Sequence, residues 1–343
     1  MPHQPKPEEL NQKFEAHSRG GILVGAIFDA FLSIYERRTG DLLRLATGGS
    51  GVLQPGAIHP DLVNRLANEA AKSARHVLGM CIRALDYCPP VDITFGEYLR
   101  AVITADADLV TDDDLGYRVA FIEAFRRRGI YPIHVRSLSE ESLRWRRAEF
   151  EQPQPSARLR AALQRLGSYA QGQPFSAGRE EIFFRSREAR REIHGWLLNH
   201  FMGNAASAGD AKFLGIDPTR FKPDTEIPSF EVHALRMAWR ECPDGGVAPQ
   251  IILTLLQDKL VPVDGTIAGG EQMVVEGGCT VVGNLQTQQI SYCIRKNLTS
   301  DTRLARQREF ALHAGESLAA TYFGAPQLDR DEAEPFALIH RGG

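Results

Sequence analysis

The sequence predicts a mainly α-helical N-terminal domain followed by a small α+β domain with an antiparallel sheet. Through about residue 140, apolar residues recur at the spacing of amphipathic helices, in four segments with short connections. From residue 230 onward the period changes to that of short β-strands. A length of 343 residues also favours two domains over one.

The first helix is expected over residues 21–37, where almost every face is apolar. A helix that is apolar all round must be covered by other elements on all sides, so we expect it to be the central helix of a bundle. Its apolar run, residues 22–35, includes Asp29 and Ser33 and is shorter than the roughly 20 residues that a bilayer span requires. No membrane segment is therefore expected.

Three further helices have marked ends. The second runs over residues 61–87, with Asp61 as its N-cap and a pair of prolines after it. The third begins with a capping box of Thr94 and Glu97. The fourth, residues 117–128, follows an acidic cluster and ends at Gly129. The predicted buried stripe of the second helix consists of Leu62, Leu66, Ala70, Ala74, Val77, Cys81, Ile82 and Leu85.

We divide the chain into a helical domain at residues 1–138, a linker with one short helix at 139–178, an α+β domain of unknown role at 179–325 and a loose tail at 326–343. The short helix of the linker is expected around residues 159–166. The α+β domain is expected to contain helices over 179–201 and 301–318, with strands near 230–234, 251–256, 280–285 and 290–295 between them.

Composition excludes several classes of function. Forty basic and 43 acidic side chains give a net charge of -3, so no global positive field attracts nucleic acid or an anionic membrane. The N-terminus has no apolar segment after a basic start, so we expect a cytoplasmic protein without a signal peptide. Five cysteines without CxxC spacing indicate reduced thiols, neither a disulfide framework nor a zinc ribbon.

The motif HSRGGI at residues 17–22, leading into an apolar helix, resembles the histidine-bearing segment of thermolysin-like zinc metallopeptidases, the gluzincins. The succession of segments at 82–85, 94–105, 106–114 and 119–129 also resembles that family, so the likeness covers about residues 12–131. The resemblance implies a helical bundle like the C-terminal domain of thermolysin, with His17 as the catalytic residue that stabilises the oxyanion. In this family an acidic residue about five positions upstream orients the histidine. Here that position is Gln12, and Glu15 is the nearest carboxylate.

The chain contains no HExxH motif, which supplies two zinc ligands and the general base in this family. We therefore expect the C-terminal portion of such a peptidase: inert alone, without a cofactor of its own, and hydrolysing peptides only when an HExxH-bearing segment or protein supplies the zinc. Such a half should expose an apolar patch on its first helix, beside His17. The alternative is a non-catalytic scaffold or binding protein that retains a degenerate peptidase half. A start codon assigned too late in the gene is a third possibility.

Other candidate sites are weaker. His194 and His200 are six residues apart on one helix, about 240° around its axis, so they cannot hold one ion together. The aspartates at 106–114 lack the register of an EF-hand and are expected to form a solvated loop and a helix cap. The sequence EGGC at residues 276–279 is expected to be a bulge or turn.

Overall fold

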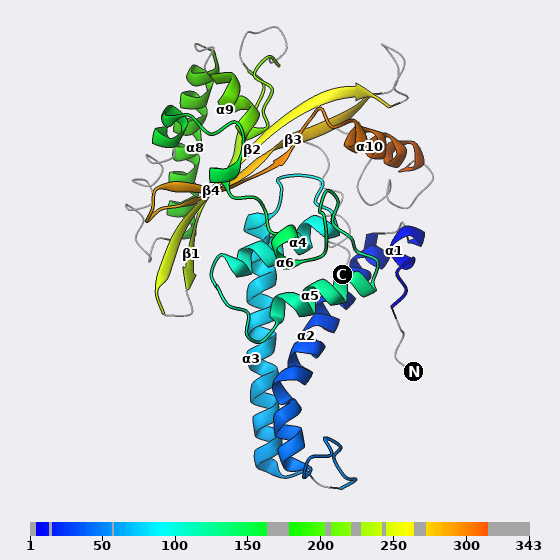
Figure 1. The fold of residues 1–343 in the computed structure, drawn as a ribbon. Coiled ribbons are helices and arrows are strands. Elements are labelled where there is room, and N and C mark those ends of the chain that lie inside the picture. Colours follow the sequence, from blue (N-terminus) through cyan, green and yellow to red (C-terminus); the bar gives the residue numbers. More distant parts are fainter. Residues whose placement is uncertain are drawn as a thin grey trace. The chain divides into compact units, whose positions relative to one another are not determined.

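A computed structural model describes residues 5–13, 16–56, 58–162, 178–202, 207–220, 228–241, 245–263 and 272–314. The chain divides into two compact units (Figure 1). Unit 1 comprises Met1–Cys88 and Ile93–Trp145, and unit 2 comprises Pro89–Asp92 and Arg146–Gly343. A helical first unit followed by an antiparallel sheet agrees with the predicted fold class at this level of detail.

The described secondary-structure elements of unit 1 are all helices. Its elements are α1 (Glu9–Gln12), α2 (Ala16–Ala46), α3 (Pro60–Ala84), the short 3-10 helix η1 (Leu85–Tyr87), α4 (Phe95–Ala107), α5 (Tyr117–Arg127) and α6 (Glu140–Leu143). Helices α2 and α3 form a long antiparallel hairpin, while α5 packs on α2 and α4 packs on α3 (Figure 1). The core of the unit includes Leu99, Ile103, Phe121 and Phe125, all fully buried.

The predicted ends of α4 and α5 are confirmed. The Thr94 hydroxyl accepts a bond from the Glu97 N–H at 3.2 Å, and the Glu97 carboxylate accepts one from the Thr94 N–H at 2.9 Å. The Asp113 carboxylate accepts bonds from the first two backbone N–H groups of α5, at 2.8 and 2.7 Å. Gly129 follows α5 with a φ of 71°, the left-handed conformation that glycine adopts most readily.

Helix α2 corrects the expectation of a helix covered on all sides. It is longer than predicted, and its buried face is a single row of Ile22, Ala26, Ala30 and Ile34. On the opposite side Val24 is 66% exposed, Phe28 56% and Leu32 37%. By length and composition, residues His17–Ala46 would also suffice to cross a membrane, a test that core helices of soluble proteins and signal sequences pass as well.

Helix α3 differs from the prediction at its start and in its buried face. Its N-cap is His59, whose Nδ1 accepts a bond from the Asp61 N–H at 3.2 Å, and Pro60 is its first residue. Its buried residues are Ser73, Val77, Met80 and Ala84. Ile82 and Leu85, predicted in the buried stripe, are exposed. The buried face of α3 is therefore rotated about the helix axis relative to the predicted one, because α2 and α4 contact a neighbouring face of α3.

Unit 2 contains a four-stranded antiparallel sheet, as predicted, and its strand order is β1-β2-β3-β4. The strands are β1 (Glu231–Glu241), β2 (Val247–Pro262), β3 (Gln272–Asn284) and β4 (Gln289–Lys296). The helices are η2 (Ala148–Phe150), α8 (Arg179–Met202), α9 (Ser207–Leu214) and α10 (Asp301–Ala314), and residues 157–162 are helical as well. Helix α8 packs on β1 and α9 on β4, around a core that includes Phe213, Leu255 and Cys279.

Two expectations for unit 2 are wrong. Gly277 and Gly278 form neither a bulge nor a turn, because they lie inside β3 and the pairing with β2 continues through them without a shift. Gly278 has a φ of +143°, and a Cβ there would lie 2.0 Å from the Leu255 carbonyl oxygen, so only glycine fits. In the helix predicted over 179–201, the apolar spacing that includes Ile182 and Phe183 indicates a buried face, but both side chains are exposed in α8.

The short segment Pro89–Asp92 belongs to unit 2, although the residues on both sides of it belong to unit 1. Its anchor is Asp92, whose carboxylate accepts bonds from Arg303 Nε at 2.8 Å and Nη2 at 2.6 Å. The Asp92 carbonyl accepts a bond from Lys296 Nζ at 2.9 Å. Both cationic side chains are buried, so the segment supplies the carboxylate that buried Arg303 requires.

Candidate functional site

His17 is the second residue of α2, so it lies within the helix and not ahead of it as predicted. Its side chain is exposed. At about 100° per residue, His17, Gly21, Val24, Phe28 and Leu32 project into one sector of about 80°. We call these five residues the α2 stripe. It lies opposite the row that packs into unit 1, and it agrees with the expectation of an apolar patch on this helix beside His17.

The backbone near His17 is accessible on its outer side. A Cβ added at Gly20 or Gly21 would meet no atom within 4 Å. Arg19 Nη1 donates to the carbonyls of Leu10 and Lys13, each at 2.9 Å, and so fixes the segment before α2 against the first turn of the helix. An extended peptide could therefore approach this end of α2 without steric conflict.

Gln12 and Glu15 are the positions to compare with the acidic residue that orients the histidine in the family. Gln12 is exposed at the end of α1, and Glu15 lies outside the described residues. The structure therefore gives His17 a position on an exposed apolar surface, and the position five residues upstream is an exposed glutamine and not a carboxylate.

The aspartates at 106–114 correct another expectation, since Asp106 is buried and not solvated. Its carboxylate contacts Arg118 Nη1 at 3.1 Å, Arg83 Nη2 at 3.3 Å and His76 Nε2 at 3.6 Å. Arg118, 2% exposed, also pairs through Nε with Glu140 at 2.9 Å. Arginines from α3 and α5 neutralise the Asp106 carboxylate, so it has no free charge with which to bind a cation. Its ion pairs instead join helices of unit 1.

No group of three or more His, Cys, Asp or Glu side chains that could hold a metal ion occurs in the part of the chain that the structure describes. His194 and His200 point to different partners, as predicted from their spacing: His194 Nε2 lies 3.1 Å from the Phe230 carbonyl, and His200 Nε2 lies 2.7 Å from Asp210. These described residues offer no zinc site.

The buried cluster around His200 is one that the sequence analysis missed. The Asp210 carboxylate accepts bonds from Ser156 N at 2.7 Å and Oγ at 2.6 Å as well as contacting His200. Serine, histidine and aspartate suggest a hydrolase triad, but here the aspartate lies between the other two, so the histidine cannot take the serine proton. The cluster instead joins α8, α9 and the helix at 157–162. No local motif could have indicated it, because Ser156 and Asp210 are 54 residues apart.

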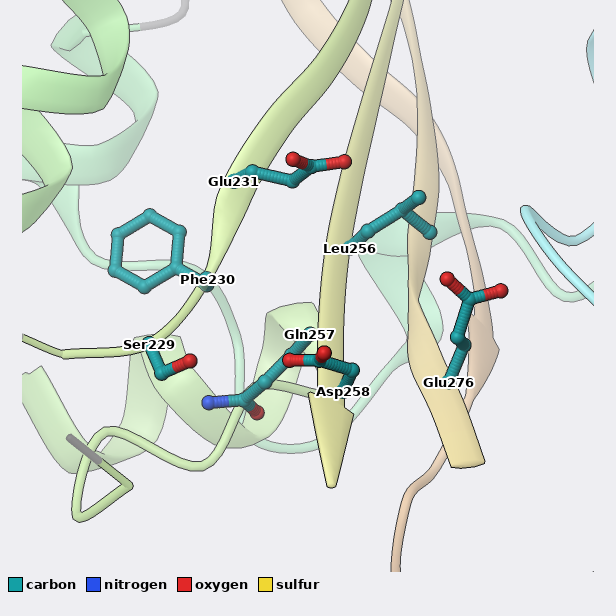
Figure 2. Close-up of a pocket in the computed structure, with 7 residues that line it drawn as sticks. All are labelled: Ser229, Phe230, Glu231, Leu256, Gln257, Asp258 and Glu276. Atoms are coloured by element: carbon teal, nitrogen blue, oxygen red, sulfur yellow. The ribbon is translucent and has the colours of Figure 1, made fainter. Parts of the chain in front are cut away.

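A cavity of about 220 Å³ lies across β1, β2 and β3 of unit 2 (Figure 2). Its lining consists of Ser229, Phe230, Glu231, Leu256, Gln257, Asp258 and Glu276. The three carboxylates come from three neighbouring strands, and Asp258 and Glu276 are register partners. The Gln257 amide is occupied, since it donates to the Asp217 carbonyl at 2.7 Å and accepts from the Asp217 N–H at 2.8 Å. The cavity is acidic, but its carboxylates do not form a metal-binding set.

Cysteine chemistry does not add a site among the described residues. Cys81, Cys88, Cys279 and Cys293 are free thiols, as expected. Burial raises the pKa of Cys88 to about 12 and that of Cys279 well above its usual range, so neither is a thiolate near neutral pH.

Comparisons with protein-family models, curated proteins and solved structures find no match to this chain. Its function must therefore be inferred from its own residues, among which the α2 stripe combines an accessible imidazole with an exposed apolar surface.

Proposed function

We propose that unit 1 is the C-terminal helical half of a thermolysin-like zinc peptidase, which hydrolyses peptide bonds only when an HExxH-bearing segment covers the α2 stripe. The observation that supports this proposal is the common face of His17, Val24 and Phe28. A soluble protein rarely leaves a row of large apolar side chains in water without a partner for it. The histidine that the family resemblance singles out lies on the same row.

The contribution of this chain is limited to binding and to one proton donor. The described residues do not form a zinc site, so the metal and the general base belong to the partner segment in this proposal. Covering the stripe would remove water from the apolar residues around His17. A hydrogen bond from an imidazole is stronger in such a low-dielectric site, where it stabilises the oxyanion of the tetrahedral intermediate. The open backbone at Gly20 and Gly21 leaves room for the peptide.

The test is co-expression of this chain with the HExxH-bearing segment encoded upstream of it or beside it, followed by hydrolysis of a fluorogenic peptide. His17→Ala should lower kcat by about 10²- to 10³-fold with little effect on KM, as expected when an oxyanion donor is lost. His59→Asn is the matched control, because it replaces another exposed histidine of unit 1 and retains its capping function. Phe28→Asp should prevent formation of the complex.

Two results would contradict the proposal. One is that the purified chain alone binds one equivalent of zinc tightly and cleaves casein. The other is an active complex in which His17→Ala leaves kcat unchanged.

A non-catalytic scaffold is the second candidate function, and the same exposed stripe favours it. A scaffold would bind its partner through Phe28 without hydrolysing peptides in any combination, and His17→Ala would leave the affinity unchanged. The two functions therefore differ in the response of hydrolysis to the histidine, while both require the apolar residues.

A further inference from the structure

A groove of about 360 Å³ between α8 and β1 of unit 2 has a basic lining. Its residues are Arg187, Arg190, Arg191, His194, Phe230, Glu231 and Val232. The four basic residues come from two consecutive turns of α8, which lies beside β1 in Figure 1. The groove is separate from the α2 stripe, which belongs to the other unit.

The charges of these arginines are not neutralised within the described residues. Elsewhere on α8, Arg185 pairs with Glu181 at 2.6 Å, but no ion pair joins Arg187, Arg190 or Arg191 to a carboxylate in the described part of the chain. Glu231, the one acidic residue of the lining, lies 3.0 Å from His233 Nδ1. Like charges four residues apart on a helix, such as Arg187 and Arg191, are destabilising. An anionic ligand would remove this repulsion.

Two groups of the groove are already held in position. Arg190 Nη1 donates to the His233 carbonyl at 2.8 Å, and the Arg190 Nε is buried without a hydrogen-bond partner among the described residues. His194 Nε2 lies 3.1 Å from the Phe230 carbonyl. These bonds fix both side chains against β1, so a ligand would not have to order them. Arg187 and Arg191 are exposed at the rim and could close on a ligand.

We propose that this groove binds a phosphate monoester, either of a small metabolite or of a phosphorylated side chain. A single guanidinium fork satisfies a carboxylate, whereas three guanidinium groups match the three terminal oxygens and nearly two negative charges of a phosphate monoester. The ligand class follows from this number of charges, and it does not depend on the proposed peptidase function of unit 1.

The experiment is isothermal titration calorimetry on the full chain with phenyl phosphate, with phenyl sulfate as a singly charged analogue of similar shape. A serine phosphopeptide and its unphosphorylated form distinguish the two sources of the phosphate. The test variant is Arg187→Gln/Arg191→Gln. Its control, Arg65→Gln/Arg75→Gln, removes the same net charge from exposed positions of α3. Unchanged thermal unfolding shows that both variants are folded.

Saturable one-to-one binding of phenyl phosphate, at least about tenfold weaker in the test variant and unchanged in the control, would support the proposal, since each charged hydrogen bond contributes a factor of this order. Tighter binding of the phosphopeptide would assign the ligand to a protein, and equal or weaker binding to a small molecule. The proposal would be overturned if phenyl phosphate did not saturate the chain below about 10 mM. Equal binding of phenyl sulfate, or equal weakening in the control variant, would overturn it as well.

Discussion

The helix α4 starts against another part of the backbone, and this contact gives a quantitative prediction for Gly96→Ala. A Cβ at Gly96 would lie 2.6 Å from the Cα of Pro132 and 2.9 Å from its nitrogen. These are backbone atoms, so no side chain can rotate away, and the chain near Pro132 must move. Overpacking of this kind costs about 1–3 kcal/mol. Alanine regains about 0.5–1 kcal/mol through its better helix propensity, so we expect a net loss of up to about 2.5 kcal/mol.

The matched control is Gly79→Ala, in the middle of α3. A Cβ there would meet no atom within 4 Å, so only the gain in propensity remains, and the free energy of unfolding should rise by about 0.5–1 kcal/mol. The same chemical change in two helices of unit 1 should therefore act with opposite signs. Because the propensity gain is common to both, the two variants should differ by the overpacking cost of about 1–3 kcal/mol, which a urea titration can resolve.

The assay must report on unit 1 alone, because two units need not unfold together. The chain has three tryptophans, and only Trp145 lies in unit 1. In a Trp196→Phe/Trp239→Phe background, Trp145 fluorescence would follow its unfolding in urea. The ring is fixed there, since its Nε1 donates to the Tyr87 carbonyl at 2.8 Å. If Gly96→Ala raised the free energy of unfolding as much as Gly79→Ala does, the close packing at Pro132 would be refuted.

Three further predictions concern the charges and thiols of unit 1. Asp106→Ala should lower the free energy of unfolding by about 1–3 kcal/mol, because buried Arg118 would lose its contact with Asp106 and keep the one with Glu140; a change below about 1 kcal/mol would contradict the buried pair. Hydrogen bonds from Arg126 and Arg127 lower the pKa of Glu123 from 4.5 to about 2. The ionised carboxylate therefore stabilises the fold fully above pH 4.5, and this stabilisation is lost as the pH falls toward 2. The Glu123 side chain is 38% exposed, so Glu123→Gln should lower the free energy of unfolding by only a few tenths of a kcal/mol at pH 7 and by nothing at pH 2. A loss of stability that persisted at pH 2 would argue against the ion pairs. Since burial raises the pKa of Cys88, its thiol should react with an aromatic disulfide reagent at pH 8 only after the chain unfolds. Rapid labelling of Cys88 in the native chain, located by mass spectrometry, would show instead that the thiol is accessible.

Local chemistry made much of the fold predictable from the sequence. The capping box of Thr94 and Glu97 and the left-handed Gly129 are set by residues within one turn of the helix they end. Short apolar, β-prone runs between residues 230 and 295 indicated an antiparallel sheet of about four strands, and the structure has four.

The faces that become buried could not be predicted in the same way, because burial depends on which elements meet. Residues 21–37 of α2 are apolar on almost every side, and nothing in the sequence indicates that the row containing Ala26 and Ala30 is the one that packs. The burial of Asp106 depends on Arg83 and Arg118, whose approach is a property of the folded unit. Helix α9, of eight residues, is too short for its period to stand out.

The candidate site was predicted in part. Its histidine and the apolar character of its helix were visible in the sequence, and the structure adds that they share a face. The basic groove of unit 2 could not be found this way. The charged residues of α8 are of mixed sign along the sequence, and only the folded unit shows that Arg187, Arg190 and Arg191 border the same groove.

The assignment of Pro89–Asp92 to unit 2 has a practical consequence for producing the two units as separate fragments. A fragment that begins at Arg146 would contain the whole sheet but would lack Asp92, leaving the guanidinium of Arg303 inside the protein with no counterion. Genetic separation of the two units at a single cut is therefore expected to give an unstable second fragment. A circular permutant, or a fusion that carries the four-residue loop along, would be the form in which the sheet could be studied by itself.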